Sequence, residues 1–170
     1  MKSESNYDFL TGIFNKAYLF KKLDDALTAM RREGDLLSML NVDIDFFAKY
    51  IESYGMEAGN NCLKTVADAV KSSLYRGDDF AARFDSDNFI SVLPCTPPRG
   101  AMVVADRVLE SVRKLQIPNG GSEVSDRLTI SVGIVSCCNT QENVVSVLFD
   151  ESKKALEQAK ANGRDRYDMR

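Results

Sequence analysis

The most constraining feature of this sequence is a pair of short apolar segments separated by only four small polar residues. Phe80–Phe84 and Phe89–Leu93 flank the link Asp85-Ser86-Asp87-Asn88. Such a pattern predicts a β-hairpin with a tight turn at or near Asp85-Ser86. An antiparallel pair in the middle of the chain means that the sheet cannot be purely parallel. The turn has two carboxylates and lacks the glycine that hairpin turns favour.

Long amphipathic segments alternate with short apolar ones along the rest of the chain. Apolar residues at helical spacing predict helices, and short apolar or alternating runs predict strands. Besides the hairpin, the pattern predicts helices over 14–33, 47–53, 56–74, 97–115 and 142–161, and strands over 36–45, 128–136 and 166–169. We therefore expect a single α/β domain over residues 1–170 with a mixed sheet.

Composition limits the possible functions. The 170 residues suffice for one core, and with 44% hydrophobic and 28% charged residues the chain is typical of a folded soluble protein. A net charge of −3 gives no indication of a nucleic-acid-binding surface. No apolar run approaches the roughly 20 residues of a membrane span, and the polar N-terminus lacks a signal peptide. Four cysteines without paired spacing and no histidine argue against a zinc site. We expect a cytoplasmic protein.

Carboxylates gather where the first predicted strand ends. Asp43 and Asp45 alternate with Ile44, so both side chains point to the same side. They are either solvated loop residues or, if Asp87 of the hairpin lies beside Asp43, part of an oxygen-rich site suited to Mg²⁺ and phosphates. Lys160 and Arg164 lie one helical turn apart near the end of the last helix. They could hold phosphates or simply complement the helix C-terminus.

A series of motifs in this order resembles a known family. The motifs are DFLTGIFNKAYLF, NVDIDFF, YGMEAGNNCL, RGDDFAARFDSDNF, TISVG and ALEQAKANGRDR. Together, from Asp8 to about Arg166, they resemble the GGDEF domains of the diguanylate cyclase family, which make cyclic di-GMP from two GTP molecules. The resemblance implies a palm-like α/β fold: a central, mostly antiparallel five-stranded sheet surrounded by helices, related to adenylyl cyclases.

The resemblance also implies a metal and phosphate site. Asp43 and Asp87 correspond to the family's catalytic, metal-binding acids, and Ile44 to the residue whose backbone carbonyl completes the Mg²⁺ or Mn²⁺ site. Lys160 and Arg164 correspond to the basic pair that holds the nucleotide phosphates.

Other positions depart from the family pattern. In the Gly-Gly-Asp/Glu-Glu-Phe signature, Asp85 and Ser86 replace the glycines and Asn88 replaces the second acid. Glycines there let the backbone approach the phosphates, whereas Asp85 adds a negative charge. Of the base-binding residues, Ile51 replaces an asparagine and Asn60 an aspartate. Ala48 replaces a lysine. We expect efficient GTP cyclisation to be lost.

A second site of the family is retained. Arg76-Gly77-Asp78-Asp79 has the Arg-x-x-Asp pattern of the product-inhibition site, nine residues before the turn. The resemblance implies that Arg76 and Asp79 bind cyclic di-GMP, since a guanidinium fork and a carboxylate suit phosphate and guanine. A surface ion pair is the alternative interpretation.

Three functional hypotheses follow. The leading one is a catalytically impaired GGDEF domain that acts as a regulatory module or cyclic di-GMP receptor. The second is a weakly active diguanylate cyclase that uses Mg²⁺ or Mn²⁺, and the third is a protein–protein interaction module without a ligand. We also expect the domain to be the output part of a longer signalling protein, with homodimerisation through an upstream domain.

Overall fold

The chain alternates helices and strands, with one hairpin in the middle. The computed structural model describes residues 5–33, 36–138 and 143–170. In these ranges the helices are α1 (Lys16–Glu33), α2 (Phe47–Tyr54), α3 (Met56–Ser72), α4 (Pro98–Lys114) and α5 (Val144–Ala161). The strands are β1 (Leu36–Ile44), β2 (Phe80–Arg83), β3 (Asn88–Leu93), β4 (Ile130–Cys138) and β5 (Tyr167–Met169).

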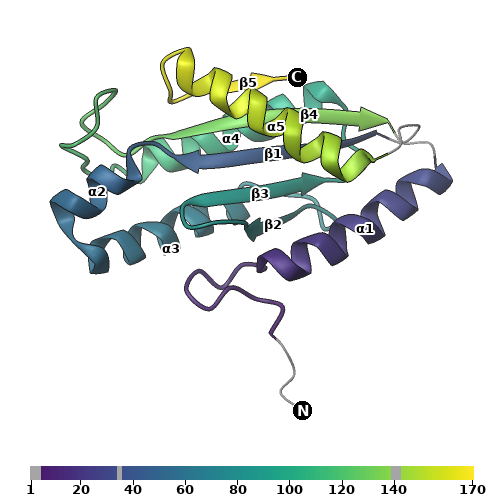
Figure 1. Ribbon diagram of the computed structural model, residues 1–170, viewed down its shortest axis with the longest axis horizontal. Coiled ribbons are helices and arrows are strands. Elements are labelled where there is room, and N and C mark those ends of the chain that lie inside the picture. The colour runs from purple at the N-terminus through teal and green to yellow at the C-terminus, as the bar shows by residue number, and fades with distance from the viewer. Residues whose placement is uncertain (1–4, 34–35, 139–142) are drawn as a thin grey trace.

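The five strands form one mixed sheet in the order β2-β3-β1-β4-β5 (Figure 1). β1 is central and runs antiparallel to both β3 and β4, and only the β4–β5 pair is parallel. The register places Asp43 opposite Asn88 on one side and Ser131 on the other. The end of β1 therefore lies beside the start of the second hairpin strand.

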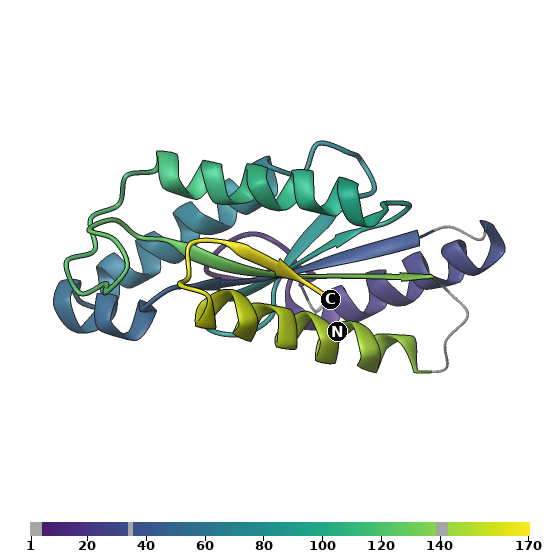
Figure 2. The ribbon, with the colours of Figure 1, turned by 90° about the horizontal axis from the view of Figure 1, so that it is seen from above.

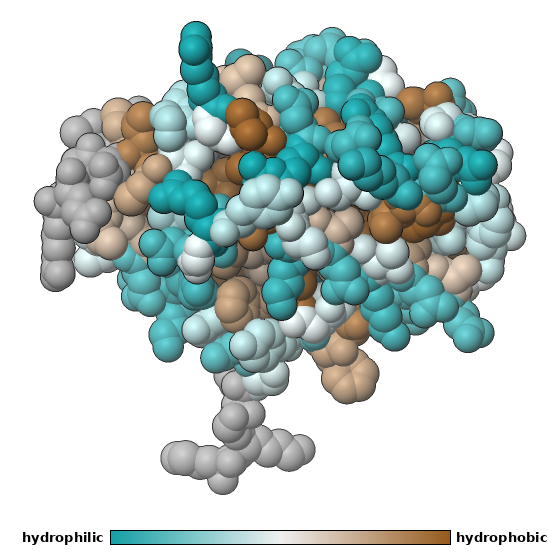
Figure 3. All heavy atoms as spheres, turned by 180° about the vertical axis from the view of Figure 1, so that it is seen from behind, coloured by the Kyte–Doolittle hydropathy of each residue, from teal (hydrophilic) through white to brown (hydrophobic). Residues whose placement is uncertain are grey.

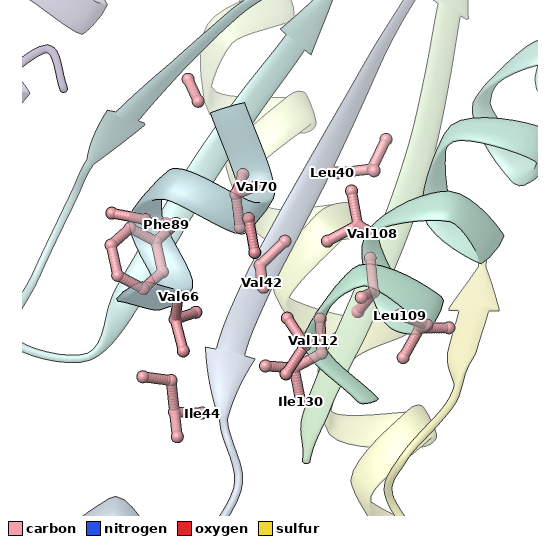
Figure 4. Close-up of a cluster of buried hydrophobic side chains, with 14 of the residues drawn as sticks. Leu40, Val42, Ile44, Val66, Val70, Phe89, Val108, Leu109, Val112 and Ile130 are labelled. Atoms are coloured by element: carbon pink, nitrogen blue, oxygen red, sulfur yellow. The ribbon is translucent and has the colours of Figure 1, made fainter. Parts of the chain in front are cut away.

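Helices cover both faces of the sheet. α3 and α4 lie on one face, and α1 and α5 lie on the other (Figure 2). Because β1 is covered on both faces, its sequence LLSMLNVDI is a nearly continuous apolar run and does not alternate. On the α3–α4 face, Val42 and Ile44 of β1 pack with Val66, Val70 and Val108 (Figure 4).

The predicted elements are confirmed, with small shifts at their ends. The first helix begins at Lys16 and not at Phe14, because the Asn15 side chain accepts a hydrogen bond from the Tyr18 N–H and so caps the helix. β4 begins at Ile130, two residues after the predicted start, because the Leu128 N–H bonds to the Ile117 carbonyl outside the sheet. The predicted start of the last helix, Glu142, lies outside the described residues.

None of the described helices combines the length and the apolar character that a membrane-spanning helix requires.

Candidate functional site

The end of β1 and the hairpin turn form the candidate site. The Ile44 N–H donates a hydrogen bond of 3.2 Å to the Asp87 carbonyl, which holds the turn against β1. Asp43 and Asp87 lie close enough for the charge of Asp87 to raise the pKa of Asp43. The fold thus brings together two carboxylates that are 44 residues apart in the sequence.

Burial makes both carboxylates costly to ionise. It is the main reason that the pKa values of Asp43 and Asp87 are raised. The charge of Asp87 adds to the effect at Asp43, and that of Asp85 adds to it at Asp87. A cation at this position would relieve the repulsion.

Lys160 of α5 supplies a positive charge within the protein. Its Nζ lies 2.6 Å from Asp43 Oδ2 and 3.5 Å from Glu157 Oε1. Burial alone would lower the pKa of Lys160, but the hydrogen bond and charge of Asp43 raise it above its ordinary value. The amine is therefore a stable ammonium group at the site.

Arg164 is held at the same end of β1 by Phe46 and Asp45. Its guanidinium lies 4.5 Å from the centre of the Phe46 ring, and Nε is 3.9 Å from Asp45 Oδ1. The Phe46 backbone, with φ of 54°, adopts the left-handed conformation just before α2. Lys160 and Arg164 thus each pair with a carboxylate at the end of β1, Lys160 with Asp43 and Arg164 with Asp45.

Asp45 is a buried hydrogen-bond acceptor that links β1 to β4, a role that its sequence context did not predict. It is only 2% exposed, so it is not the solvated loop residue considered as one alternative. Its carboxylate accepts hydrogen bonds from Thr129 Oγ1 (2.8 Å), Ser131 Oγ (2.7 Å) and the Asp165 N–H (3.3 Å). The only sequence signal was a pair of hydroxyl residues two apart at the start of β4, and their link to Asp45 depends on the β1–β4 register.

The signature turn forms without glycine. Neither Asp85 nor Ser86 has a positive φ, so an ordinary side chain is tolerated at both positions. Arg83 holds the turn by donating from Nε and Nη2 to the Ser86 carbonyl at 3.0 and 2.8 Å, and the Ser86 N–H bonds to Asp85 Oδ1. The substitution of both glycines therefore changes the surface of the turn while its backbone remains intact.

Asn88 is used within the sheet. Its amide donates to Asn41 Oδ1 (2.7 Å) and to the Val42 carbonyl (3.1 Å). Asn41 in turn donates to Ser152 Oγ of α5. Position 88 therefore has no acid, and its amide forms hydrogen bonds between β3 and β1.

The two positions predicted to have lost base binding, Ile51 and Asn60, lie near each other on α2 and α3. A Cβ placed on Gly59 would be 2.9 Å from Ile51 Cγ1, so the Ile51 side chain fills the space beside the backbone that precedes Asn60. Ile51 also packs against the core and offers no polar atom. The half-buried Asn60 amide has no hydrogen-bond partner among the described residues.

Arg76 and Asp79 lie in the connection between α3 and β2. Arg76 Nη1 donates to Thr96 Oγ1 (2.9 Å) and to the carbonyls of Pro94 (3.2 Å) and Cys95 (3.3 Å). Asp79 Oδ1 is buried without a hydrogen-bond partner among the described residues. Burial raises the pKa of Asp79 although the charges of Arg76 and Arg107 oppose this. The two residues are near neighbours, but they do not form the surface ion pair considered as the alternative.

Asp79 also lines a cavity of about 240 Å³. The cavity lies between the N-terminal segment, the end of α3 and β2, and its other walls include Tyr7, Phe14, Lys71 and Phe80.

The comparisons with known proteins agree with this geometry. A family model described as "Diguanylate cyclase, GGDEF domain" matches residues 5–166. Diguanylate cyclase A of Treponema denticola is 36% identical over 165 residues, which cover 95% of this chain and 43% of that protein. The chain therefore spans less than half of the length of this curated relative.

Two solved structures have the same fold. Diguanylate cyclase SiaD from Pseudomonas aeruginosa, solved in complex with its activator SiaC, superposes with a TM-score of 0.86 at 30% identity, covering 99% of this chain and 63% of that one. The GGDEF domain of DgcB from Caulobacter crescentus, solved with cyclic di-GMP, gives a TM-score of 0.83 at 20% identity, with coverages of 99% and 95%.

The mixed five-stranded sheet with an acidic, lysine-bridged site at the end of its central strand defines a palm-like α/β domain. Within that class, the chain belongs to the GGDEF domain family of diguanylate cyclases.

Proposed function

We propose that this GGDEF domain is impaired in GTP cyclisation and acts as a regulatory module that binds cyclic di-GMP through Arg76 and Asp79. The observation that carries the proposal is a contrast between the two sites. At the catalytic site, key positions are apolar or engaged within the fold, whereas Arg76 is anchored with part of its guanidinium free.

The argument for impaired catalysis rests on the base position and the turn. Ile51 cannot hydrogen-bond a guanine, and Asn60 offers one donor and one acceptor where the N1–H and N2–H₂ edge of guanine needs acceptors. A site built to hydrogen-bond a polar base discriminates against other bases by about 10⁴-fold or more, and a site that leaves the guanine groups unpaired loses this discrimination. Asp85 adds a further negative charge beside Asp87, where a triphosphate would have to lie.

The acidic residues fit a divalent cation. Asp43, Asp87 and the Ile44 carbonyl provide the hard oxygen donors that Mg²⁺ or Mn²⁺ prefers, and their mutual repulsion is of the kind that a cation relieves. Such a metal would supply charge neutralisation for phosphate oxygens. Lys160 and Arg164, which lie beside Asp43 and Asp45, would hold the phosphates. Lys160 already neutralises Asp43, so we expect weak metal binding without nucleotide.

The argument for a receptor rests on the preorganisation of Arg76. Within the described part of the chain, all of its hydrogen bonds use Nη1, so the Nε–Nη2 edge is free. This edge is suited to a bidentate contact with guanine or phosphate. Asp79 offers a buried carboxylate oxygen that a ligand N–H would satisfy.

Calorimetric titration with cyclic di-GMP tests the proposal. We expect micromolar binding by the unmutated domain and no binding by Arg76→Ala. Arg127→Ala is a matched control, because Arg127 Nη1 also donates to a backbone carbonyl, that of Gln116, away from this site. Asp87→Ala should bind nearly normally. If the unmutated domain gives no heat at high micromolar ligand, the receptor is excluded and the interaction-module hypothesis takes its place.

Weak cyclase activity is a second candidate, favoured by the assembly of Asp43, Asp87 and Lys160. Incubation of an artificially dimerised form of the domain with GTP and Mg²⁺ or Mn²⁺, followed by chromatography for cyclic di-GMP, tests this candidate. We further propose that the domain works in the cytoplasm as the output part of a longer signalling protein, whose upstream domain brings two copies together.

A further inference from the structure

A tyrosine next to Arg76 is stacked on an arginine of α4. The guanidinium carbon of Arg107 lies 3.6 Å from the centre of the Tyr75 ring. Arg107 Nη1 also donates a hydrogen bond of 2.7 Å to the Ser73 carbonyl, at the end of α3. The guanidinium is thus held by this hydrogen bond, and it covers one face of the Tyr75 ring.

The other face of the Tyr75 ring is accessible. The residue is 72% exposed, and its ring contacts no second aromatic ring among the described residues. It follows α3 and contacts α4, and Figure 3 shows separate hydrophobic side chains among hydrophilic ones on the face opposite to that in Figure 1. An aromatic ring with one covered face and one solvent-exposed face can accept a planar group on the exposed one.

Charged groups lie near Tyr75 in the chain. Tyr75 directly precedes Arg76, and the positive charges of Arg76 and Arg107 both act on the carboxyl of Asp79. The segment that follows α3 therefore carries an exposed aromatic ring backed by Arg107, and next to it in the chain the guanidinium of Arg76 and the carboxyl of Asp79. An anionic ligand with flat rings that carry N–H donors matches this combination.

We propose that Tyr75 is a base-stacking residue that holds one guanine of cyclic di-GMP while Arg76 binds the same ligand. This inference rests on the proposed receptor function and adds a contact that the Arg-x-x-Asp motif does not contain. Stacking on an aromatic side chain is sequence-tolerant, so Tyr75 supplies affinity, whereas Arg76 and Asp79 supply the choice of base.

Two substitutions at Tyr75 test the affinity by calorimetry with cyclic di-GMP. Tyr75→Ala should weaken binding about tenfold or more. Tyr75→Phe, which keeps the ring, should bind within about twofold of the unmutated domain. Because the side chain is mostly exposed, we expect the thermal unfolding midpoints of both variants to stay near that of the unmutated domain.

Fluorescence gives a second readout, since the chain contains no tryptophan. Tyr75→Trp introduces a single indole at the site, and stacking of guanine on it should quench its emission as cyclic di-GMP is added. Tyr54→Trp is the control, because Tyr54 lies on α2 and is also partly exposed, at 43%. Its emission should not change.

The outcomes separate the two proposals. If the unmutated domain binds, Arg76→Ala abolishes binding, and Tyr75→Ala binds normally with no quenching in Tyr75→Trp, the stacking role is wrong and the receptor stands. If the unmutated domain does not bind, both proposals fall.

Discussion

At the residue scale, the half-buried carboxylate of Asp79 carries a cost in stability at a residue that we propose binds cyclic di-GMP. Burial raises its pKa above the ordinary value of 3.8, and its Oδ1 has no partner among the described residues. A buried carboxylate without full compensation destabilises the folded state, and such residues are frequent at binding sites. We therefore expect the role of Asp79 to appear as opposite effects on stability and on affinity.

Asp79→Asn should stabilise the domain and weaken cyclic di-GMP binding. Because the folded pKa is raised, ionisation favours the unfolded chain at pH values above the folded pKa, and the variant avoids this cost. We expect the unfolding midpoint at pH 7 to rise by about 2–4 °C, or about 1 kcal/mol. The gain should disappear below pH 3.8, where the carboxyl is protonated in both states.

Asp68→Asn is the control for Asp79→Asn, because Asp68 is an exposed carboxylate on α3 and is not among the charges that act on Asp79. It should change the midpoint little at any pH. A destabilised Asp79→Asn domain would show that the carboxylate is compensated by groups other than those described.

Asp8 has the opposite effect on stability. Burial would raise its pKa, but hydrogen bonds from Thr11 and the nearby charge of Arg83 lower it below 3.8. The stabilisation is therefore fully present above pH 3.8 and is lost as the pH falls through the folded pKa. Asp8→Asn should lower the free energy of unfolding at pH 7 by about 1–2 kcal/mol. Urea titrations at pH 7 and pH 3 should show the difference shrinking at acid pH. An equal difference at both pH values would contradict this assignment.

The sequence predicts some roles of single residues but not others. The family resemblance assigned Asp43, Asp87 and Lys160 to one site, and in the structure Asp43 lies close to both of the others. The buried bonds of Asp45 were not predictable, because they depend on which residues of β4 lie opposite the end of β1. The anchoring of Arg76 depends on the β3–α4 turn, which has no recognisable motif.

At the scale of the elements, β4 and α5 are in unusually close contact. A Cβ on Gly133 would lie 2.2 Å from the Ser152 carbonyl oxygen and 2.4 Å from the Leu156 nitrogen. Both are backbone atoms of a helix, so they cannot move aside as a flexible side chain could. The same helix carries Lys160, so this contact also sets the position of the ammonium group against Asp43.

Gly133→Ala should therefore be strongly destabilising. Overpacking against backbone costs about 3 kcal/mol or more, which corresponds to a fall of the unfolding midpoint of about 6–12 °C. Gly120→Ala is the matched control, since its nearest contact would be Tyr54 Oη at an ordinary 3.6 Å. It should change stability by less than about 0.5 kcal/mol. Equal midpoints for the two variants would mean that α5 can shift away from the sheet at little cost.

The elements themselves were predictable because local pattern and tertiary structure agree. Helical and strand periodicities gave each helix and strand to within about two residues, apart from the last helix, whose predicted start lies outside the described residues. The strand order was not predictable from periodicity, since it requires knowing that β1 inserts between β3 and β4. The family resemblance predicted a mostly antiparallel five-stranded sheet, and the structure gives its strand order.

At the scale of the whole molecule, the resemblance to diguanylate cyclases implies that two domains must face each other to join two GTP molecules. A lack of activity in an isolated domain would therefore not distinguish a degenerate site from a missing partner copy. The chain covers 43% of its relative from Treponema denticola, so residues outside this domain could set the dimer in longer proteins. A test of catalysis must provide the dimer independently.

Fusion of the domain to a parallel coiled coil removes this ambiguity, because it raises the effective concentration of one domain near another. The dimerised unmutated domain should still make no detectable cyclic di-GMP from GTP and Mg²⁺, since its base position and its turn remain degenerate. A dimerised variant with the family residues restored should make the product, provided that circular dichroism shows it folded. The restored positions are Ala48→Lys, Ile51→Asn, Asn60→Asp, Asp85→Gly, Ser86→Gly and Asn88→Glu.

Asp43→Ala in the restored variant should abolish both the product and any metal-dependent shift of the unfolding midpoint. Product from the unmutated dimer would overturn the proposed impairment and establish the weak cyclase, because the substitutions at Ile51, Asn60 and Asp85 would then have been tolerated by the reaction.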